Sequence, residues 1–223
     1  MEPIIHIIDD DRSFRTALGR LVETYGFGAS CYESGEEFFV RLPQSETGCI
    51  LLDLRMPGLS GPELQERLAQ AVPLLPIVFL TGQATISASV QAMKAGADDF
   101  LEKPVSSKIL RAVIERALAQ NERRSAGHDQ IQALQTKVFS LTPREIQVFD
   151  LVVRGRRNKQ VAYDLNTSER TIKAHRHSIM EKLGVTSFAE MVSIAERLGP
   201  VRSTQAVSNP TSGSSPKANI QRH

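Results

Sequence analysis

Short apolar runs alternate with amphipathic segments along the first 120 residues of the chain. Brief apolar runs are typical of buried strands, whereas apolar residues spaced three and four apart are typical of helices packed on one face. The pattern predicts strands at residues 4–8, 28–32, 49–53, 76–81 and 99–102. It predicts helices at residues 13–24, 34–41, 61–71, 84–95 and from about residue 106, several with Ser or Gly near the N-cap. Such regular alternation predicts an α/β fold with a doubly wound, five-stranded parallel sheet.

The helical pattern continues past the end of this predicted sheet domain. The segment from Ser106 to Val138 contains no Pro, and its first apolar stripe is followed by polar residues at 120–124. We expect the last helix of the sheet domain to run into a helical linker. Apolar residues then recur at Ile131, Leu134 and Val138, which indicates either a short dimerising helix or a helix packed on its own domain.

Residues 141–199 contain no strand-like run, and their pattern predicts an all-α domain of four helices. Thr142 is a predicted N-cap, with Pro143 at the first helical position and Glu145 three residues after the cap. This helix should end near Gly155. Apolar residues with the spacing of a core follow in the last two helices: Met180, Leu183, Val185, Phe188, Met191, Val192 and Ile194.

The second and third helices of this domain predict a helix-turn-helix. One begins at Asn158, a tight turn follows at residues 165–167, and Ser168 is the predicted N-cap of the next helix.

The patterns divide the chain into four segments. We expect a sheet domain at residues 1–120, a helical linker at 121–140, the helical domain at 141–199 and a tail at 200–223. The tail is rich in Ser, Pro, Asn and Thr and has few apolar residues to bury, so it is expected to be disordered.

Charge separates the two halves. Residues 1–120 carry 11 Lys and Arg against 16 Asp and Glu, whereas residues 121–200 carry 13 against 9. Clustered cations favour a polyanion, so a nucleic-acid partner is expected for the second half.

Cysteine content and hydropathy indicate the compartment. Cys31 and Cys49 cannot form a disulfide framework, and both lie in strand-like runs where buried free thiols are usual. No apolar stretch has the length of a membrane span, and the first residues lack a secretory pattern. We expect a cytoplasmic protein that is neither secreted nor inserted in a membrane.

Acidic residues follow two of the predicted strands. Asp9, Asp10 and Asp11 come directly after the first strand, and Asp53 ends the third. The carboxyl ends of parallel strands meet at one sheet edge, so Asp9, Asp10 and Asp53 can converge there. Their repulsion and their oxygen ligands favour Mg²⁺. The alternative is that the triplet is only a polar loop.

Two further polar residues end the fourth and fifth strands. Thr81 would supply a hydroxyl donor and Lys103 a counter-charge, which together suit a phosphoryl group.

This combination resembles the receiver domain of two-component response regulators over residues 1–120. The resemblance lies in the double acid after the first strand, Asp53 before Met-Pro-Gly, Thr81 and the Lys103-Pro104 pair. It implies that Asp53 accepts a phosphoryl group from a sensor histidine kinase. It also implies that Asp10 binds Mg²⁺ directly, Asp9 through water, and the backbone carbonyl of Arg55 completes the protein ligands, while Thr81 and Lys103 contact the phosphoryl oxygens.

The resemblance carries two more expectations. Phe100 would be the aromatic switch that turns inward as Thr81 moves toward the phosphate; the alternative is a plain core residue. The Lys103-Pro104 bond would be cis, although most X-Pro bonds are trans.

The helical domain resembles the LuxR-type output domain of the NarL/FixJ class through LTPRE, NKQVA, TIKAH and EKLGV. Lys173, Ala174 and His177 match positions that face base edges, whereas Asn158, Lys159, Thr171 and Arg176 are candidates for phosphate or edge contacts. The alternative is an exposed basic helix that is only solvated. Asn166 stands where most members carry Gly, and Asn tolerates the left-handed conformation. His175 is expected to pack or cap internally.

The two resemblances together imply a phosphorylation-activated transcriptional regulator. Its expected partners are a sensor histidine kinase, double-stranded promoter DNA and, when phosphorylated, a second copy of the chain that meets the last helix; RNA polymerase is a candidate partner. We expect no enzymatic activity beyond self-phosphorylation from a donor and self-dephosphorylation.

Two other functions fit parts of the pattern. A Mg²⁺-dependent phosphatase could use Asp53 as its nucleophile, but it would need a positioned general acid or a second catalytic aspartate two residues on, where the chain has Arg55. A DNA-binding protein could instead carry a degenerate receiver that is a phosphate-blind interaction module, but the intact set of Asp10, Asp53, Thr81 and Lys103 argues against it.

Overall fold

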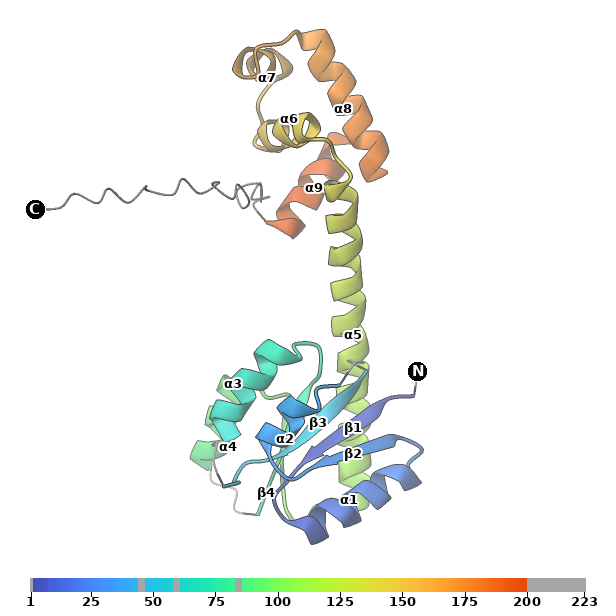
Figure 1. The fold of residues 1–223 in the computed structure, drawn as a ribbon, viewed down its shortest axis with the longest axis vertical. Helices are drawn as coiled ribbons and strands as arrows, with labels where there is room; N and C mark the ends of the chain where they lie inside the picture. Colours follow the sequence, from blue (N-terminus) through green and yellow to red (C-terminus); the bar gives the residue numbers. More distant parts are fainter. Residues whose placement is uncertain (1, 44–46, 58–60, 83–85, 200–223) are drawn as a thin grey trace, which may run out of the picture. The chain divides into compact units, whose positions relative to one another are not determined.

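The computed structural model describes residues 2–43, 47–57, 61–82 and 86–199, and the chain divides into two compact units, Met1–Gln130 and Ile131–His223. The first unit contains strands β1 (Ile4–Ile8), β2 (Gly28–Tyr32), β3 (Gly48–Asp53), β4 (Ile77–Thr81) and β5 (Asp99–Glu102). They form one parallel sheet in the order β2-β1-β3-β4-β5 (Figure 1). The parallel five-stranded sheet expected from the sequence is confirmed.

Helices cover both faces of this sheet. They are α1 (Arg12–Thr24), α2 (Gly35–Val40), α3 (Gly61–Ala71), α4 (Ile86–Lys94) and α5 (Ser107–Phe139). Helices α1 and α5 pack on one face, and α2, α3 and α4 pack on the other (Figure 1). All six residues of β3 are buried, because a central strand of such a sheet meets helices on each side. Leu51 joins the core under α1 and α5, while the next residue, Leu52, joins the opposite core.

The observed bounds differ slightly from the sequence prediction. Helix α1 begins at Arg12, one residue early, because the Asp11 carboxylate accepts hydrogen bonds from the backbone N–H groups of Ser13 and Phe14. The predicted helix at 84–95 is observed as α4; residues 83–85 lie outside the described residues.

Helix α5 is one continuous helix of 33 residues that passes through Gly127 without a break. Its polar segment contacts the sheet of the first unit and the loops before its strands. The Asn121 side chain accepts a hydrogen bond from Gly48 N–H at 3.0 Å and donates one to the Leu74 carbonyl at 2.9 Å. Arg124 forms an ion pair with Asp98 at 2.7 Å, and the other Asp98 oxygen accepts the N–H of Ile77 at the start of β4. These bonds hold α5 to the amino-terminal edge of the sheet.

The second unit contains four further helices, as expected: α6 (Pro143–Val153), α7 (Asn158–Asp164), α8 (Glu169–Leu183) and α9 (Phe188–Leu198). They enclose one apolar core around Val148, Phe149 and Ile179. Val138, near the end of α5, is buried in this core and Leu134 packs against it. This packing favours the second of the two alternatives for that segment, a helix packed on its own domain.

Two expectations about burial were wrong. Phe188, predicted as a core residue, is 42% exposed, and its ring faces the Arg176 guanidinium at 5.5 Å instead of the core. Cys31 is only half-buried, because β2 is an edge strand of the sheet; Cys49 is fully buried, and burial raises the pKa of its thiol to about 12.

Two remaining sequence expectations concern the tail and the membrane. The tail at residues 200–223 lies outside the described residues. Within the described part of the chain, no helix combines the length and the apolar character that a bilayer span requires.

We predict that Asn121→Ala destabilises the first unit by about 2–4 kcal/mol, because the substitution removes the partners of the buried Gly48 N–H and the partly buried Leu74 carbonyl. Native-state hydrogen exchange of the β3 amides would measure the loss. Gln120→Ala is the control, since Arg124 still pairs with Asp98 after Gln120 is removed. Equal exchange in both variants would contradict the role of Asn121.

Candidate functional site

Three carboxylates meet at the carboxyl edge of the sheet. The register pairs Ile8 with Leu52, so Asp9, directly after β1, lies beside Asp53 at the end of β3. The strand order reverses at this place, since β1 lies between β2 and β3. Oxygens of Asp9, Asp10 and Asp53 all lie within 4.8 Å of one another, with Asp9 and Asp53 buried and Asp10 exposed. The arrangement has the donor set of a site for a hard divalent cation.

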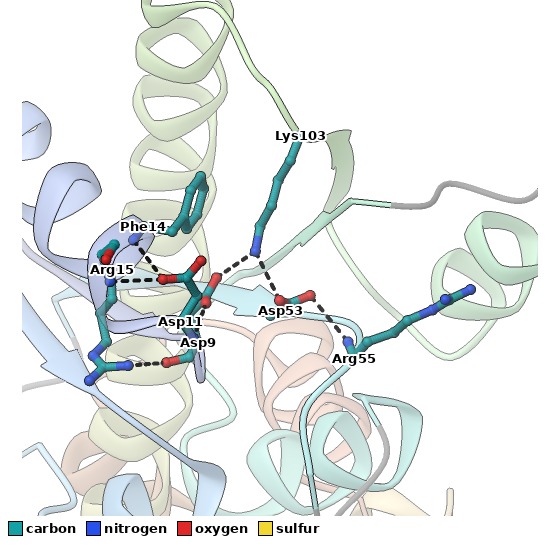
Figure 2. A network of polar contacts seen from close by, with 8 residues as sticks. Asp9, Asp11, Phe14, Arg15, Asp53, Arg55 and Lys103 are labelled. Carbon is teal, nitrogen blue, oxygen red and sulfur yellow. Dashed lines mark hydrogen bonds and ion pairs between the residues drawn. The ribbon is translucent and has the colours of Figure 1, made fainter.

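Lys103 supplies a positive charge to this cluster (Figure 2). Its Nζ lies 2.6 Å from Asp9 Oδ2 and 2.8 Å from Asp53 Oδ2, and its side chain is only 16% exposed. The residue directly follows β5, where its backbone N–H donates to the Thr81 carbonyl at 2.7 Å. The Lys103-Pro104 bond is cis, as expected from the family resemblance.

The charges of the cluster do not balance. Burial raises the pKa of Asp9 above its ordinary value, against the opposing effect of Lys103. Burial by itself would lower the pKa of Lys103, but its hydrogen bonds to Asp53 and Asp9 raise it. One ammonium lies among three carboxylates. The uncompensated negative charge at this edge of the sheet would attract an added cation.

The other predicted site residues lie around this cluster. Thr81 ends β4, on the strand beside β3, and is fully buried. Arg55 donates its backbone N–H to Asp53 Oδ1 at 3.1 Å, while its side chain extends away from the carboxylates (Figure 2). Phe100 is half-buried, packs against the core under α2, α3 and α4, and lies 6.4 Å from the Phe79 ring.

Three residues shape the site in roles that the sequence did not predict. Asp11 caps α1, and its own N–H donates to Asp9 Oδ1 at 2.9 Å. The Arg15 guanidinium donates to the Asp9 carbonyl. The Phe14 ring lies 4.1 Å from the Lys103 ammonium. An Asp two residues before a Ser-Phe helix start was a readable N-cap signal for Asp11, whereas nothing local indicated the partners of Arg15 and Phe14.

The second unit has the predicted helix-turn-helix geometry. Ser168 Oγ accepts the N–H of Thr171 at 3.1 Å and so caps α8. Asn166 has φ 48°, the left-handed conformation that its place in the turn requires. At the other end of α8, Lys137 Nζ donates to the Leu183 carbonyl at 3.0 Å. Both ends of α8 are therefore fixed.

The predicted DNA-contacting residues separate into two groups. Five of them are exposed: Lys159, Thr171, Lys173, Ala174 and His177. The other two bind each other, since Arg176 Nη1 donates to Asn158 Oδ1 at 2.7 Å. His175 is half-buried. Arg170, which the sequence analysis omitted, is exposed and lies three residues before Lys173; that helical spacing would have placed it on the same face.

Glu145 joins α6 to α8. Its carboxylate accepts hydrogen bonds from the Thr142 N–H at 2.7 Å, Ser178 Oγ at 2.7 Å and Lys182 Nζ at 2.6 Å. Burial raises the pKa of Glu145, but the bonds from Lys182, Ser178 and Thr142 outweigh it and lower the pKa to about 2. The predicted capping box is confirmed, and the same carboxylate also orients α8.

Comparisons with known proteins agree with this two-unit organisation. The family profile described as the response regulator receiver domain matches residues 5–115, and the profile of the luxR family of bacterial regulatory proteins matches residues 139–195. The chain is 40% identical to the response regulator protein TmoT of Ectopseudomonas mendocina over 197 residues, which cover 88% of the chain and 90% of the relative. It is 38% identical to the transcriptional regulatory protein FixJ of Bradyrhizobium diazoefficiens, over 87% of the chain and 95% of the relative.

Solved structures give the same result. The low-resolution structure of the response regulator StyR has a TM-score of 0.71 and 41% identity, and the match covers 88% of the chain and all of StyR. Full-length FixJ from B. japonicum has a TM-score of 0.54 and 38% identity, over 88% of the chain and 97% of FixJ.

We predict that Glu145→Gln lowers the unfolding free energy of the second unit by about 2 kcal/mol near neutral pH, because Lys182 loses a buried anionic partner. A carboxyl whose pKa is depressed in the folded state stabilises the fold above its ordinary pKa, and this stabilisation is lost as pH falls toward about 2. The difference between wild type and variant should therefore shrink below about pH 5. Urea unfolding followed by the NMR amide signals of α8 would measure it.

The matched control is Glu181→Gln, which removes an exposed carboxylate of α8. A difference between wild type and Glu145→Gln that stays constant from about pH 7 to about pH 3 would contradict the ionic role of Glu145.

Proposed function

The chain belongs to the response regulators that join a receiver domain to a LuxR-type DNA-binding domain, and from this premise we propose that Asp53 is its phosphoryl acceptor. As a member of this family it is a transcriptional regulator of a two-component system, with a sensor kinase and DNA as partners. The observation that supports Asp53 most directly is the Lys103 ammonium, which bridges Asp9 and Asp53 within the carboxylate cluster.

The proposed reaction is an in-line transfer to a carboxylate. An Asp53 oxygen forms a bond to phosphorus as the bond between phosphorus and the donor's leaving atom breaks, and an aspartyl phosphate results. Lys103 moves its hydrogen bonds to the phosphoryl oxygens, and the Thr81 hydroxyl donates to another of them. Water later hydrolyses the aspartyl phosphate, so self-phosphorylation and self-dephosphorylation are the proposed activities of the chain.

The carboxylates and one backbone carbonyl would hold the metal. Asp9, Asp10, Asp53 and the Arg55 carbonyl fit Mg²⁺, since they offer only oxygen ligands and carry more negative charge than Lys103 balances. When bound, Mg²⁺ would reduce the repulsion between the carboxylates and the incoming phosphate.

Phe100 is the proposed switch residue of the receiver domain. Its half-buried ring already packs beside Phe79 on the strand that carries Thr81, so a movement of Thr81 toward the phosphate would change the space available to it. The Phe100 ring would become more deeply buried when Asp53 is phosphorylated.

The exposed face of α8 is the proposed reading surface for DNA. Lys173, Ala174 and His177 would meet base edges in the major groove, while Lys159 and Thr171 would contact phosphates. Arg176 and Asn158 form a hydrogen bond through Nη1 and Oδ1. We still propose that both contact DNA, through side-chain atoms that this bond does not use.

The proposed chain has four segments and several partners. We assign residues 1–120 to the receiver, 121–140 to the linker, 141–199 to the DNA-binding domain and 200–223 to a tail. We also propose that the phosphorylated chain forms a homodimer through α9. This dimer would bind promoter DNA with paired half-sites and contact RNA polymerase. The proposed compartment is the cytoplasm, where the free thiols of Cys31 and Cys49 stay reduced.

We predict that the wild-type chain takes up one phosphoryl group from acetyl phosphate with Mg²⁺ and that Asp53→Asn takes up none, because the amide is not a nucleophile. Intact-mass spectrometry would measure this. Asp129→Asn is the control, since it makes the same change at an exposed residue of α5 that lies outside the carboxylate cluster. Wild-type protein that stays unmodified, or Asp53→Asn that is modified at the same rate, would reject the assignment.

We predict that Lys173→Ala and His177→Ala each reduce discrimination between cognate and altered promoter sequences by about 1–3 kcal/mol. Lys159→Ala should weaken binding to all sequences alike and flatten its salt dependence, because it loses one phosphate contact. Binding isotherms on both kinds of DNA at several salt concentrations would separate the two effects. Equal losses on every sequence for all three variants would contradict the assignment of α8.

A further inference from the structure

An aromatic ring closes the third side of the Lys103 ammonium. Nζ of Lys103 lies 2.6 Å from Asp9, 2.8 Å from Asp53 and 4.1 Å from the centroid of the Phe14 ring (Figure 2). We propose that Phe14 is a positioning residue for phosphoryl transfer, whose ring holds the Lys103 ammonium at the carboxylate cluster. This inference rests on the proposed role of Asp53 as acceptor.

The local structure fixes the place of Phe14. Asp9 accepts the N–H of Asp11 at 2.9 Å, and the Asp11 carboxylate accepts the N–H of Phe14 at 3.1 Å as the N-cap of α1. The ring is half-buried and packs against the core under α1 and α5. The same short segment therefore sets both a carboxylate that binds Lys103 and the ring beside Lys103.

This contact is unusual among the cation–aromatic contacts of the chain. Five such contacts occur in the described residues, and that of Phe14 has the shortest distance and is the only one made by a lysine. The other four involve Arg41, Arg67, Arg111 and Arg176. Only the Phe14 contact lies at the carboxylate cluster.

An aromatic ring suits the movement that Lys103 must make. Before transfer the ammonium binds two carboxylates, and after transfer it must bind phosphoryl oxygens on one of them. A hydrogen-bonding side chain in place of Phe14 would hold one N–H in a fixed direction and compete with the phosphoryl group. The attraction between an ammonium and a ring face has little directional preference, so Lys103 can pivot while it stays in contact. The ring also keeps water from that side.

The test compares full-length variants in phosphorylation by acetyl phosphate with Mg²⁺. We expect Phe14→Leu, which keeps an apolar side chain but loses the ring, to slow phosphorylation about threefold to tenfold, the range expected for a partly desolvated cation–aromatic contact. Phe14→Trp should restore the rate to within about twofold, because a Trp ring attracts cations at least as well.

The matched control is Phe39→Leu. Phe39 is also half-buried and lies 4.5 Å from the Arg67 guanidinium, and it packs on the face of the sheet opposite to Phe14. Its loss should leave the rate unchanged. The inference is wrong if Phe14→Leu reacts at the wild-type rate, if Phe14→Trp is as slow as Phe14→Leu, or if Phe39→Leu is slowed equally.

An NMR measurement separates this inference from the proposed function. The ring should shift the side-chain proton signals of Lys103 upfield in the unmodified wild type, and Phe14→Leu should abolish that shift; Lys103→Met identifies the signals. A wild type that accepts no phosphoryl group would overturn Asp53 as acceptor and the catalytic part of the inference, while a retained shift would still establish the contact. An absent shift in a wild type that accepts phosphate would overturn the positioning role alone.

Discussion

The ion pairs of Lys103 with Asp9 and Asp53 link three strands at one edge of the sheet. A parallel sheet brings the carboxyl ends of its strands together, so acids that follow β1 and β3 must lie close and repel each other. The ammonium from the end of β5 offsets part of that repulsion. Because one cation faces three carboxylates, the geometry that makes the edge costly in free energy also suits it to the proposed metal and phosphoryl group.

Strand β5 joins this edge to the long helix of the first unit. It has only four residues, and each of its ends is held by charge: Lys103 follows it at the carboxylate cluster, while Asp98 precedes it and pairs with Arg124 of α5. Phe100 lies between these two ends. A rearrangement of Lys103 when Asp53 becomes phosphorylated would therefore act on a short strand whose other end is fixed to α5, which gives the proposed switch a defined physical basis.

The second unit uses buried polar contacts to present one exposed helix. Glu145 orients α8 from the side through Ser178 and Lys182, while Ser168 and Lys137 satisfy its two ends. The backbone groups that helix ends usually leave open are thus partly satisfied inside the unit. Its outward face, with Lys173 and His177, is exposed and is the proposed surface for DNA.

The sequence by itself determined the succession of strands and helices along the chain, the acids at the strand ends, the capping box at Thr142 and the left-handed turn at Asn166. Each of these depends on periodicity or on neighbours within a few residues. Only the tertiary structure decided that Lys103 binds both Asp9 and Asp53, which lie 94 and 50 residues away, that Phe14 covers it, and that Asn121 and Arg124 are contacts of the sheet. It likewise decided that Arg176 binds Asn158 and that Phe188 is exposed. Side chains so far apart in the chain are paired by the packing of whole elements, and local patterns carry no record of that packing.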